Sequence, residues 1–548
     1  MAHRMATRTV AEVVAAKLHA AGVRRVFGLP GGETVELLDA LRRVGIDFVL
    51  VANESSALFM ADAQIRLEGG VGVCLTTLGP GATNAVMGCA HAYLDRAPIL
   101  LITAQKPAAL LPDYTHQVLD LHALFCPITK ATWRIHPANT DAVLSAALDL
   151  AVTGRPGPVH LQLSNEDAGQ PYPPGDDSTP TDIPTPPPFD PTIVDQARAL
   201  LRQARRPLIL AGLGLEPQRP YTELRALAES LAAPVVVTPK AKGALPDGHA
   251  LAGGVIGLTH TDPAYALVDE ADCIVAVGFD VVELVKPWAT PAPLIWLAPW
   301  TNHDPVLPAV VELVGDTAAY LRALARDDYD SDPAWGATRV ARYRADLAKP
   351  LPSPAPGRLL PQQVLSTLRA GLPRHAIMVV DVGSHKIHSS LEWPTLVPNS
   401  FLLSNGLSGM GYALPAALGA SLAAPDTPVV CLTGDAGMAM VMGELAVLAA
   451  QGGPILVTVL NDGAIDLIRA QQVRAGKPVY GTEFVPPDFT QIAAAYGLPA
   501  VRVTTQDALC RAIADFMAAP TPRVIEVMLD PISYPTTPQP STHSSRTT

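Results

Sequence analysis

Short apolar runs alternate with longer Ala-rich stretches along almost the whole chain. In the first third, the runs at 72–76 and 99–103 have the length of strands, and the stretch at 56–68 indicates a helix. Buried strands that alternate with helices form parallel sheets with helices on both faces. The pattern therefore predicts an α/β protein built from doubly wound parallel-sheet domains. The other predicted strands are 25–27, 48–51, 159–162, 207–211, 235–237, 273–277, 294–297, 377–380, 429–433, 455–460 and 524–528.

Clusters of proline divide this pattern into three blocks. Proline accounts for 54 of the 548 residues, and the clusters fall at 171–191 and 346–358. Proline-rich backbone is stiff and extended and cannot continue a helix. The predicted organisation is an N-terminal domain at 1–170, a linker at 171–191, a central domain at 192–345, a linker at 346–358, a C-terminal domain at 359–534 and a disordered tail at 535–548.

Charge and composition exclude several classes of partner. The chain has 39 Lys and Arg against 51 Asp and Glu, a net charge of −12, so it lacks the basic surface that nucleic-acid binding needs. No apolar run reaches the length of a membrane span, and the N-terminus has no apolar signal core. The six cysteines form no CxxC pair. We therefore expect a cytoplasmic protein with reduced thiols.

Two acidic residues follow neighbouring strands in the last block. The predicted strand 429–433 leads to Asp435, and a helix is expected to open after Gly437 and run to about 450. The predicted strand 455–460 leads to Asp462, so one β-α-β unit places both carboxylates at the same edge of the sheet. Mg²⁺ prefers oxygen ligands completed by phosphates, and helix N-termini bind phosphates. Two ordinary turns after strands would explain the same residues on spacing alone.

The residues around Asp435 and Asp462 resemble the diphosphate–magnesium motif of thiamine-diphosphate-dependent enzymes, a Gly-Asp-Gly followed by Asn-Asn. Ala436 stands for the glycine at the third position of Gly-Asp-Gly. Asp462 stands for the second asparagine, so this chain keeps a ligating oxygen there and adds a negative charge. The resemblance implies Mg²⁺ on Asp435, Asp462 and the backbone carbonyl of Ala464. The diphosphate contacts implied are Gly434, Asp435, Ala436, Gly437, Asp462, Ala464 and Ile465.

Glu54 follows the predicted strand 48–51 and opens the predicted helix. By itself, a glutamate at this junction is explained as a first-turn helix cap. In the thiamine-diphosphate family, a glutamate here hydrogen-bonds the aminopyrimidine and promotes loss of the thiazolium C2 proton, which gives the nucleophilic ylide. The resemblance therefore implies that Glu54 is catalytic, although Asn53 stands where the family usually has His.

Four more segments resemble cofactor loops of this family, so the resemblance covers the first and third blocks. They are 27–32, an FGxPG turn; 78–84, an SGPGATN loop; 381–385, a diphosphate loop; and 404–415, the loop that bends the cofactor. The contacts implied are Pro30, Gly31, Gly32, Pro80, Asn84, Gly383, Ser384, His385, Ser408 and Met410. The family arrangement also implies a cofactor that bridges two subunits, and so a homodimer or a dimer of dimers.

The substrate-facing residues are similar to those of acetolactate synthases. Gln117 matches a glutamine of those enzymes, and His116 stands where they have phenylalanine. The sequence Thr-His-Gln at 115–117 also resembles that of carboxyethylarginine synthase. Both residues are expected to be catalytic, with a solvated loop histidine as the alternative for His116. The segment from Val277 to Glu283 resembles the FAD-independent, catabolic type, and Val282 falls where flavin-binding enzymes have Arg. FAD is therefore not expected.

Three functions are compatible with these motifs. The first is an acetolactate synthase-like carboligase that joins two pyruvate molecules, with loss of CO₂ through an enamine intermediate. The second is another non-oxidative thiamine lyase: a 2-oxo acid decarboxylase, a cyclic-dione hydrolase or a carboxyethylarginine synthase-like enzyme. The third is a catalytically silent cofactor binder, which only Asp462 and His116 favour.

Overall fold

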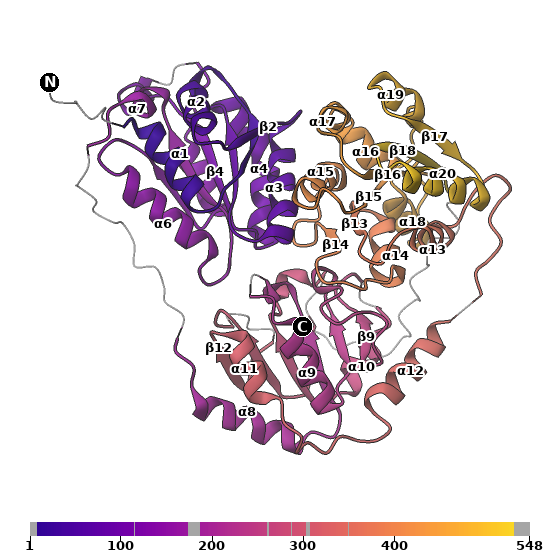
Figure 1. Ribbon diagram of the computed structural model, residues 1–548. Helices are drawn as coiled ribbons and strands as arrows, with labels where there is room; N and C mark the ends of the chain where they lie inside the picture. The colour runs from indigo at the N-terminus through magenta and orange to yellow at the C-terminus, as the bar shows by residue number, and fades with distance from the viewer. Residues whose placement is uncertain are drawn as a thin grey trace. The chain divides into compact units, whose positions relative to one another are not determined.

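The computed structural model describes residues 8–113, 116–173, 187–216, 218–259, 262–285, 288–302, 307–348 and 350–530. Within these ranges, the strands form three parallel sheets of six strands each, flanked by helices (Figure 1). Each predicted block contains one sheet, which confirms the predicted fold class. The predicted tail at 535–548 and most of the predicted linker at 171–191 lie outside the described residues.

The described residues belong to two compact units. One unit combines Met1–Thr185 with Gly406–Val429 and Val441–Ile455, and the other combines Pro186–Asn405, Val430–Met440 and Leu456–Thr548. Helices α15 and α17 of the last block therefore belong to the first unit.

The first sheet has the strand order β2-β1-β3-β4-β6-β5. Its strands are β1 Arg25–Leu29, β2 Asp47–Leu50, β3 Gly72–Thr76, β4 Ile99–Ala104, β5 Ala131–Arg134 and β6 Val159–Leu163. The order reverses between β1 and β3, and such a switch point is where parallel sheets bind ligands, at the carboxyl ends of the strands. The helices are α1 Val10–Ala20, α2 Val35–Arg43, α3 Glu54–Glu68, α4 Gly79–Leu94, α5 Leu121–Phe125, α6 Thr140–Val152 and α7 Asn165–Gly169.

The last sheet, β14-β13-β15-β16-β18-β17, repeats the order of the first, so its switch point lies between β13 and β15. Its strands are β13 Ile377–Val380, β14 Phe401–Leu403, β15 Val429–Gly434, β16 Ile455–Asn461, β17 Ala500–Val503 and β18 Arg523–Met528. The helices of this part of the chain are α13 Pro361–Gly371, α14 Ser384–Glu392, α15 Ala413–Ala423, α16 Asp435–Val441, α17 Glu444–Gln451, α18 Asp466–Arg474, α19 Phe489–Ala495 and α20 Gln506–Ala518.

The middle sheet has the order β12-β11-β10-β7-β8-β9, with its switch point between β7 and β10. Its strands are β7 Pro207–Ala211, β8 Val235–Val237, β9 Ala252–Val255, β10 Cys273–Val277, β11 Leu294–Ala298 and β12 Val311–Val314. Its helices are α8 Pro191–Gln203, α9 Tyr221–Leu231, α10 Tyr265–Glu270, α11 Thr317–Leu324 and α12 Gly336–Leu347.

One predicted helix begins and ends differently in the structure. The helix expected to open after Gly437 starts at Asp435 as α16, ends at Val441, and resumes as α17 at Glu444. Asp435 starts the helix because its carboxylate accepts a hydrogen bond from the Ala436 N–H (2.7 Å), which occupies one of the unpaired donors of the first turn. No helix in the described part of the chain is long and apolar enough to cross a membrane.

Candidate functional site

The loops that follow β1 and β3 meet at the switch point of the first sheet. A Cβ atom at Gly31 would lie 2.3 Å from Thr77 Oγ1, so only glycine allows this approach. Thr77 Oγ1 in turn donates to Glu33 Oε2 (3.1 Å). The predicted cofactor residues Pro30, Gly31 and Gly32 are thus held against the segment that leads to Pro80.

Glu54 is the first residue of α3, and its side chain is buried, with 3% of the residue exposed. Asn53 caps the helix by accepting from the Ser55 N–H (2.9 Å). Asn84 Nδ2 donates to Glu54 Oε2 (3.0 Å), while Oε1 faces Gly81, whose absent Cβ would lie 3.1 Å away. The structure therefore brings together Glu54, Asn84 and the loop of Pro80, as the motifs implied.

Glu444 is a further buried carboxylate at this junction, which the motifs did not indicate. Its two oxygens accept from the backbone N–H groups of Asn53 (3.1 Å) and Ala52 (3.2 Å), immediately before Glu54. Burial raises the pKa of Glu444, against the hydrogen bonds that Ser56, Ala52 and Asn53 donate. The only sequence signal is a charged residue in the otherwise apolar start of α17.

His116 and Gln117 lie in a turn after β4, and both are exposed. Gln117 has a left-handed backbone (φ 65°), and a Cβ atom at Gly79 would lie 2.5 Å from its carbonyl oxygen. Gln117 is therefore positioned beside the start of α4, next to Pro80. The catalytic roles of His116 and Gln117 stay predictions.

Ser408 and Met410 lie in the segment before α15 and are half-buried. Ser408 has φ 55°, a conformation that a non-glycine residue adopts at an energetic cost and that often marks a functional turn. A Cβ atom at Gly409 would lie 2.6 Å from Met87 Cε, which places this turn against α4.

In the second unit, the loops after β13 and β15 meet at the switch point of the last sheet. Gly383 precedes α14, and His385 on that helix lies against Gly434, with its Cε1 3.2 Å from the Cβ position of that glycine. Gly437 faces Asp381, whose Oδ2 would be 2.5 Å from a Cβ atom. Burial, together with His388 and Lys386, lowers the pKa of His385 to about 4, so its ring is neutral at pH 7.

Asp435 and Asp462 lie side by side, as the spacing predicted. Asp435 Oδ2 accepts from the backbone N–H groups of Gly463 (2.7 Å) and Asp462 (3.2 Å). Burial raises the pKa of Asp435. Burial and then the charges of Asp435 and Asp466 raise the pKa of Asp462 to about 7, against the attraction of Arg469.

The donor set of these two residues fits a hard divalent cation. Asp462 Oδ2 is buried, has no hydrogen-bond partner among the described residues, and lies 3.9 Å from the Arg469 guanidinium. Ala464 N–H donates to Asp462 Oδ1 (3.2 Å), and Ile465 follows as the N-cap of α18. The described residues contain no cluster of three or more His, Cys, Asp or Glu side chains for a metal. A cation here needs carbonyl and phosphate oxygens besides the two carboxylates.

Two contacts that support the loop around Asp462 were not indicated by the motifs. Glu526 on β18 is fully buried and accepts from Asn461 Nδ2 (2.6 Å) and Arg502 Nε (2.9 Å). Ser384 Oγ donates to Asp466 Oδ2 (3.1 Å), which ties the start of α14 to the start of α18. Both contacts join residues far apart in the chain, so no local pattern could have found them.

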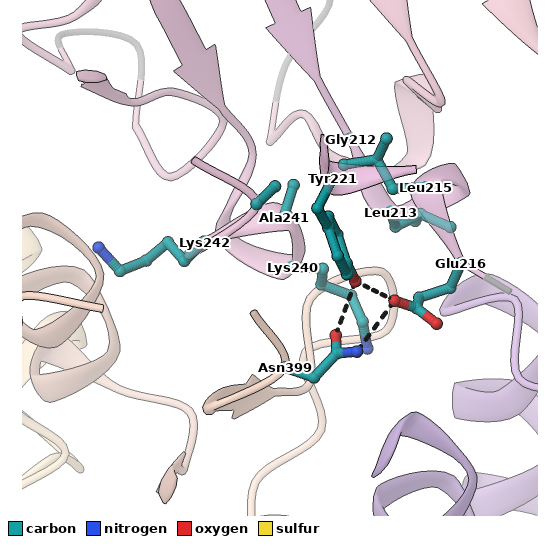
Figure 2. Close-up of a pocket in the computed structure, with 10 residues that line it drawn as sticks. Gly212, Leu213, Leu215, Glu216, Tyr221, Lys240, Ala241, Lys242 and Asn399 are labelled. Atoms are coloured by element: carbon teal, nitrogen blue, oxygen red, sulfur yellow. Dashed lines mark hydrogen bonds between the residues drawn. The ribbon is translucent and has the colours of Figure 1, made fainter. Parts of the chain in front are cut away.

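At the switch point of the middle sheet, a buried carboxyl group bridges the loops that follow β7 and β10. Glu283, buried after β10, accepts from the backbone N–H of Leu213 after β7 (2.8 Å). Burial raises the pKa of Glu283 to about 8. In the neighbouring recess, Figure 2 shows that Tyr221, Glu216 and Asn399 point toward one another, and Asn399 Nδ2 donates to Glu216 Oε1 (3.0 Å).

Comparison with known proteins identifies all three domains. Residues 8–124 match the thiamine pyrophosphate enzyme, N-terminal TPP binding domain. Residues 194–324 match the central domain of these enzymes, and residues 381–527 match their C-terminal TPP binding domain. The three matches follow the order of the three sheets.

Several curated relatives cover nearly the whole chain. The acetolactate synthase large subunit of Parasynechococcus marenigrum is 34% identical, over 92% of this chain and 85% of the relative. The acetolactate synthase isozyme 3 large subunit of Escherichia coli is 32% identical, over 90% and 89%. A probable acetolactate synthase large subunit of Methanocaldococcus jannaschii is 30% identical, over 95% and 92%. Both thiamine-binding domains are matched, and relatives of this kind cover at least 90% of the chain. The chain therefore belongs to the thiamine pyrophosphate enzyme family, as an acetolactate synthase-like member.

Proposed function

We propose that this chain is a Mg²⁺-dependent, thiamine-diphosphate-dependent carboligase that joins two pyruvate molecules. Two pyruvate ions and one proton give one 2-acetolactate ion and CO₂. The observation that carries this proposal is the buried carboxylate of Glu54, which Asn84 holds at the switch point of the first sheet. The names of the relatives supply the reaction class.

Asp435, Asp462 and the carbonyl of Ala464 would hold the magnesium ion. Their fit rests on the proximity of the two carboxylates and on the buried Oδ2 of Asp462, which accepts no hydrogen bond from the described residues. The open helix starts at Ser384 and Asp435 offer N–H groups to a diphosphate. The divalent cation would offset the repulsion that raises the pKa of Asp462.

When bound, thiamine diphosphate supplies a carbon nucleophile that adds to a 2-oxo acid and stores the electron pair left by CO₂. Glu54 would exchange a proton with the nitrogen of the aminopyrimidine ring. Its burial strengthens that hydrogen bond, because few water molecules compete for the carboxylate. Asn84 would keep the carboxyl group in one orientation through Oε2. Met410 and Ser408 would support the bent cofactor from the turn against α4.

We infer that FAD is not a cofactor of this chain. At the switch point of the middle sheet, where a dinucleotide phosphate would meet a loop N–H, the Glu283 carboxylate already accepts from Leu213 (2.8 Å). A phosphate would have to displace this buried carboxyl group from the Leu213 N–H. We expect the purified protein to be colourless, and a flavin absorbance band would contradict this inference.

We further propose a homodimer, or a dimer of dimers, in the cytoplasm. The resemblance supports the assembly, because enzymes of this kind bind one cofactor between two chains. The six cysteines are all free thiols, in keeping with a reducing compartment. The substrate is a small 2-oxo acid, and no nucleic acid or membrane is expected as a partner.

The proposed reaction is tested by incubating the purified chain with pyruvate, thiamine diphosphate and Mg²⁺ and identifying the products. Formation of 2-acetolactate with one CO₂ per product supports the carboligase. Release of CO₂ with acetaldehyde would instead identify a decarboxylase. Tight cofactor binding without turnover, on pyruvate and on a panel of other 2-oxo acids and diones, would identify a silent binder. Turnover of another member of the panel would identify a different lyase. This is the principal alternative to the carboligase, because His116 stands where acetolactate synthases have phenylalanine.

A further inference from the structure

A buried cluster of charged side chains joins helices α3 and α4 to the segment that precedes α15. Asp62, His91, Asp95 and Tyr412 have no exposed surface, and the Arg66 side chain is 9% exposed. All five residues belong to the first unit. None of them is among the predicted cofactor or substrate contacts, so the cluster needs a separate explanation.

His91 lies between the two carboxylates. Its Nε2 is 3.1 Å from Asp62 Oδ2, and its Nδ1 is 2.9 Å from Asp95 Oδ2. The Nε2 contact is a hydrogen bond, and the Nδ1 contact is an ion pair when the ring is protonated. An ionised carboxylate only accepts hydrogen bonds, so the ring pairs with both residues in its doubly protonated form. Arg66 Nε donates to Asp62 Oδ1 (3.0 Å) and Arg66 also contacts the Asp95 carbonyl. An imidazolium at His91 and the Arg66 guanidinium thus balance the two buried negative charges.

The same two carboxylates hold both ends of the segment 406–412. Asp95 Oδ1 accepts from the Gly406 N–H (3.3 Å), and Asp62 Oδ2 accepts from the Tyr412 hydroxyl (3.0 Å). Gly406 also lies so close to α4 that a Cβ atom would be 2.8 Å from the Leu94 backbone. Ser408 and Met410, the residues implied to support the bent cofactor, lie between these two attachment points.

Helix α3 connects this cluster to the catalytic carboxylate. Glu54 opens the helix, and Asp62 follows eight residues later, about two turns along. Gly419 on α15 packs on the same helix, because a Cβ atom there would lie 2.1 Å from the Met60 carbonyl oxygen. One rigid helix therefore carries Glu54 at its start and an anchor of the 406–412 segment in its second half.

We propose that His91 is a positioning residue, which holds the 406–412 segment in its cofactor-binding conformation through Asp62 and Asp95. This proposal depends on the proposed function in one respect: it assumes that thiamine diphosphate contacts the 406–412 segment. Without the imidazolium, the two carboxylates repel each other and the segment loses its fixed ends. Only a fraction of the chains would then have the binding conformation, and the apparent affinity for the cofactor falls by that fraction.

This arrangement gives cofactor binding a defined pH dependence. Burial lowers the pKa of His91, but the charges and hydrogen bonds of Asp95 and Asp62 outweigh burial, so the pKa lies above its usual value. The titratable groups that face the ring are Asp62 on α3, Asp95 after α4 and Tyr412 before α15, and Arg66 on α3 is bonded to Asp62 and to the Asp95 carbonyl. The stabilisation is complete below the ordinary histidine pKa of about 6.5 and is lost as the pH rises through the raised pKa of His91.

The test compares His91→Gln with His160→Gln, a matched control in the same unit. His160 is also fully buried, but its ring nitrogens contact the hydroxyls of Thr103 (2.9 Å) and Thr132 (2.7 Å), and burial lowers its pKa to about 3. Two readouts need no substrate: hydrogen exchange at 406–412, and calorimetric titration with thiamine diphosphate in excess Mg²⁺ between pH 6 and pH 9.

His91→Gln is expected to speed exchange at 406–412 and to weaken cofactor binding about tenfold at pH 6.5. The wild type is expected to lose thiamine diphosphate affinity as the pH rises through the raised pKa of His91. His91→Gln should abolish this pH dependence. His160→Gln should keep the wild-type pH profile even if it lowers stability. Tyr412→Phe, which removes one hydroxyl, should speed exchange at 406–412 and serves as the second test if His91→Gln does not fold.

Unchanged exchange at 406–412 and an unchanged pH profile in a folded His91→Gln would overturn the proposal. If His91→Gln does not fold, unchanged exchange at 406–412 in Tyr412→Phe would overturn it. That result differs from a failure of the proposed function. If the chain were not a thiamine-diphosphate enzyme of this type, the wild type itself would bind no cofactor, and exchange at 406–412 would still report whether His91 anchors the segment.

Discussion

At the scale of single residues, the proposed mechanism depends most on one proton-carrying side chain, that of Glu54. Replacing Glu54 with Gln keeps the size of the side chain and an oxygen that Asn84 can contact, but removes the group that exchanges a proton. We expect kcat to fall by about 10²–10⁴-fold, with thiamine diphosphate affinity within a few-fold of wild type. Steady-state kinetics and calorimetric titration measure the two effects separately.

Glu68→Gln is the matched control for this substitution. Glu68 ends the same helix, and its partly exposed side chain pairs with Arg25 at the surface. This variant should keep wild-type turnover. Normal turnover in Glu54→Gln would contradict the role of Glu54 and with it the proposed mechanism.

His116 is a predicted substrate-facing residue at which this chain departs from the acetolactate synthase motif. It is exposed in a turn beside Gln117, where those enzymes have phenylalanine. His116→Phe should raise the ratio of pyruvate coupling to activity on other 2-oxo acids, because an apolar ring packs against a small acyl group. Assaying 2-acetolactate formed from pyruvate, and CO₂ released from a panel of other 2-oxo acids, gives this ratio. The control His122→Phe, at an exposed position of α5, should leave this ratio unchanged. If the two variants have the same ratio, His116 is not part of the site.

The residues found from the sequence are those with a local signature. Glu54, Asp435 and Asp462 each follow a strand and open a loop or helix, so their neighbours in the chain identify them. Glu444 and Glu526 were not found, because each acts through hydrogen bonds to residues far away in the sequence, at Asn53 and Asn461. A buried carboxylate of this kind is visible only when the fold brings its partners together.

At the scale of elements, the contact between α3 and α15 depends on one glycine. A Cβ atom at Gly419 would lie 2.1 Å from the Met60 carbonyl oxygen, which is far inside van der Waals contact. Gly419→Ala should therefore push the helices apart and lower the free energy of unfolding by about 1–3 kcal/mol. Chemical denaturation measures this loss.

Gly248→Ala is the control for the helix contact. A Cβ atom at Gly248 would meet no atom within 4 Å, so its effect on the free energy of unfolding should stay within about 0.5 kcal/mol. Equal stability of Gly419→Ala and Gly248→Ala would show that α15 can move away from α3 without loss.

The predicted strands are mainly those in the interior of the sheets. The interior strands β3, β4 and β10 are buried on both faces and appear in the sequence as continuous apolar runs. The edge strands β5, β9, β12, β14 and β17 were not predicted. Most are short or carry exposed residues, such as the two central residues of β17, so their sequences lack an apolar run.

At the scale of the whole molecule, the first and last sheets repeat one strand order. Their switch points hold the two halves of the proposed chemistry, with Glu54 near one and Asp435 with Asp462 at the other. The middle sheet has a different order, and Glu283 bridges the loops after β7 and β10 at its switch point. This division explains how a chain of net charge −12 can bind an anionic diphosphate. The proposed diphosphate site relies on backbone N–H groups and Mg²⁺ rather than a basic surface.

The proposed assembly, with each cofactor between two chains, can be tested by mixing two inactive variants. If each cofactor contacts Glu54 of one chain and Asp435 of a second copy, Glu54→Gln and Asp435→Asn should each be inactive alone. A mixed dimer of the two variants contains one site with both residues intact. Random mixing makes half of the dimers mixed, so co-refolded variants should recover about a quarter of wild-type activity. Assaying activity against mixing ratio measures this recovery. A site formed within one chain gives no recovery at any ratio, because every chain would then lack either its glutamate or its aspartate.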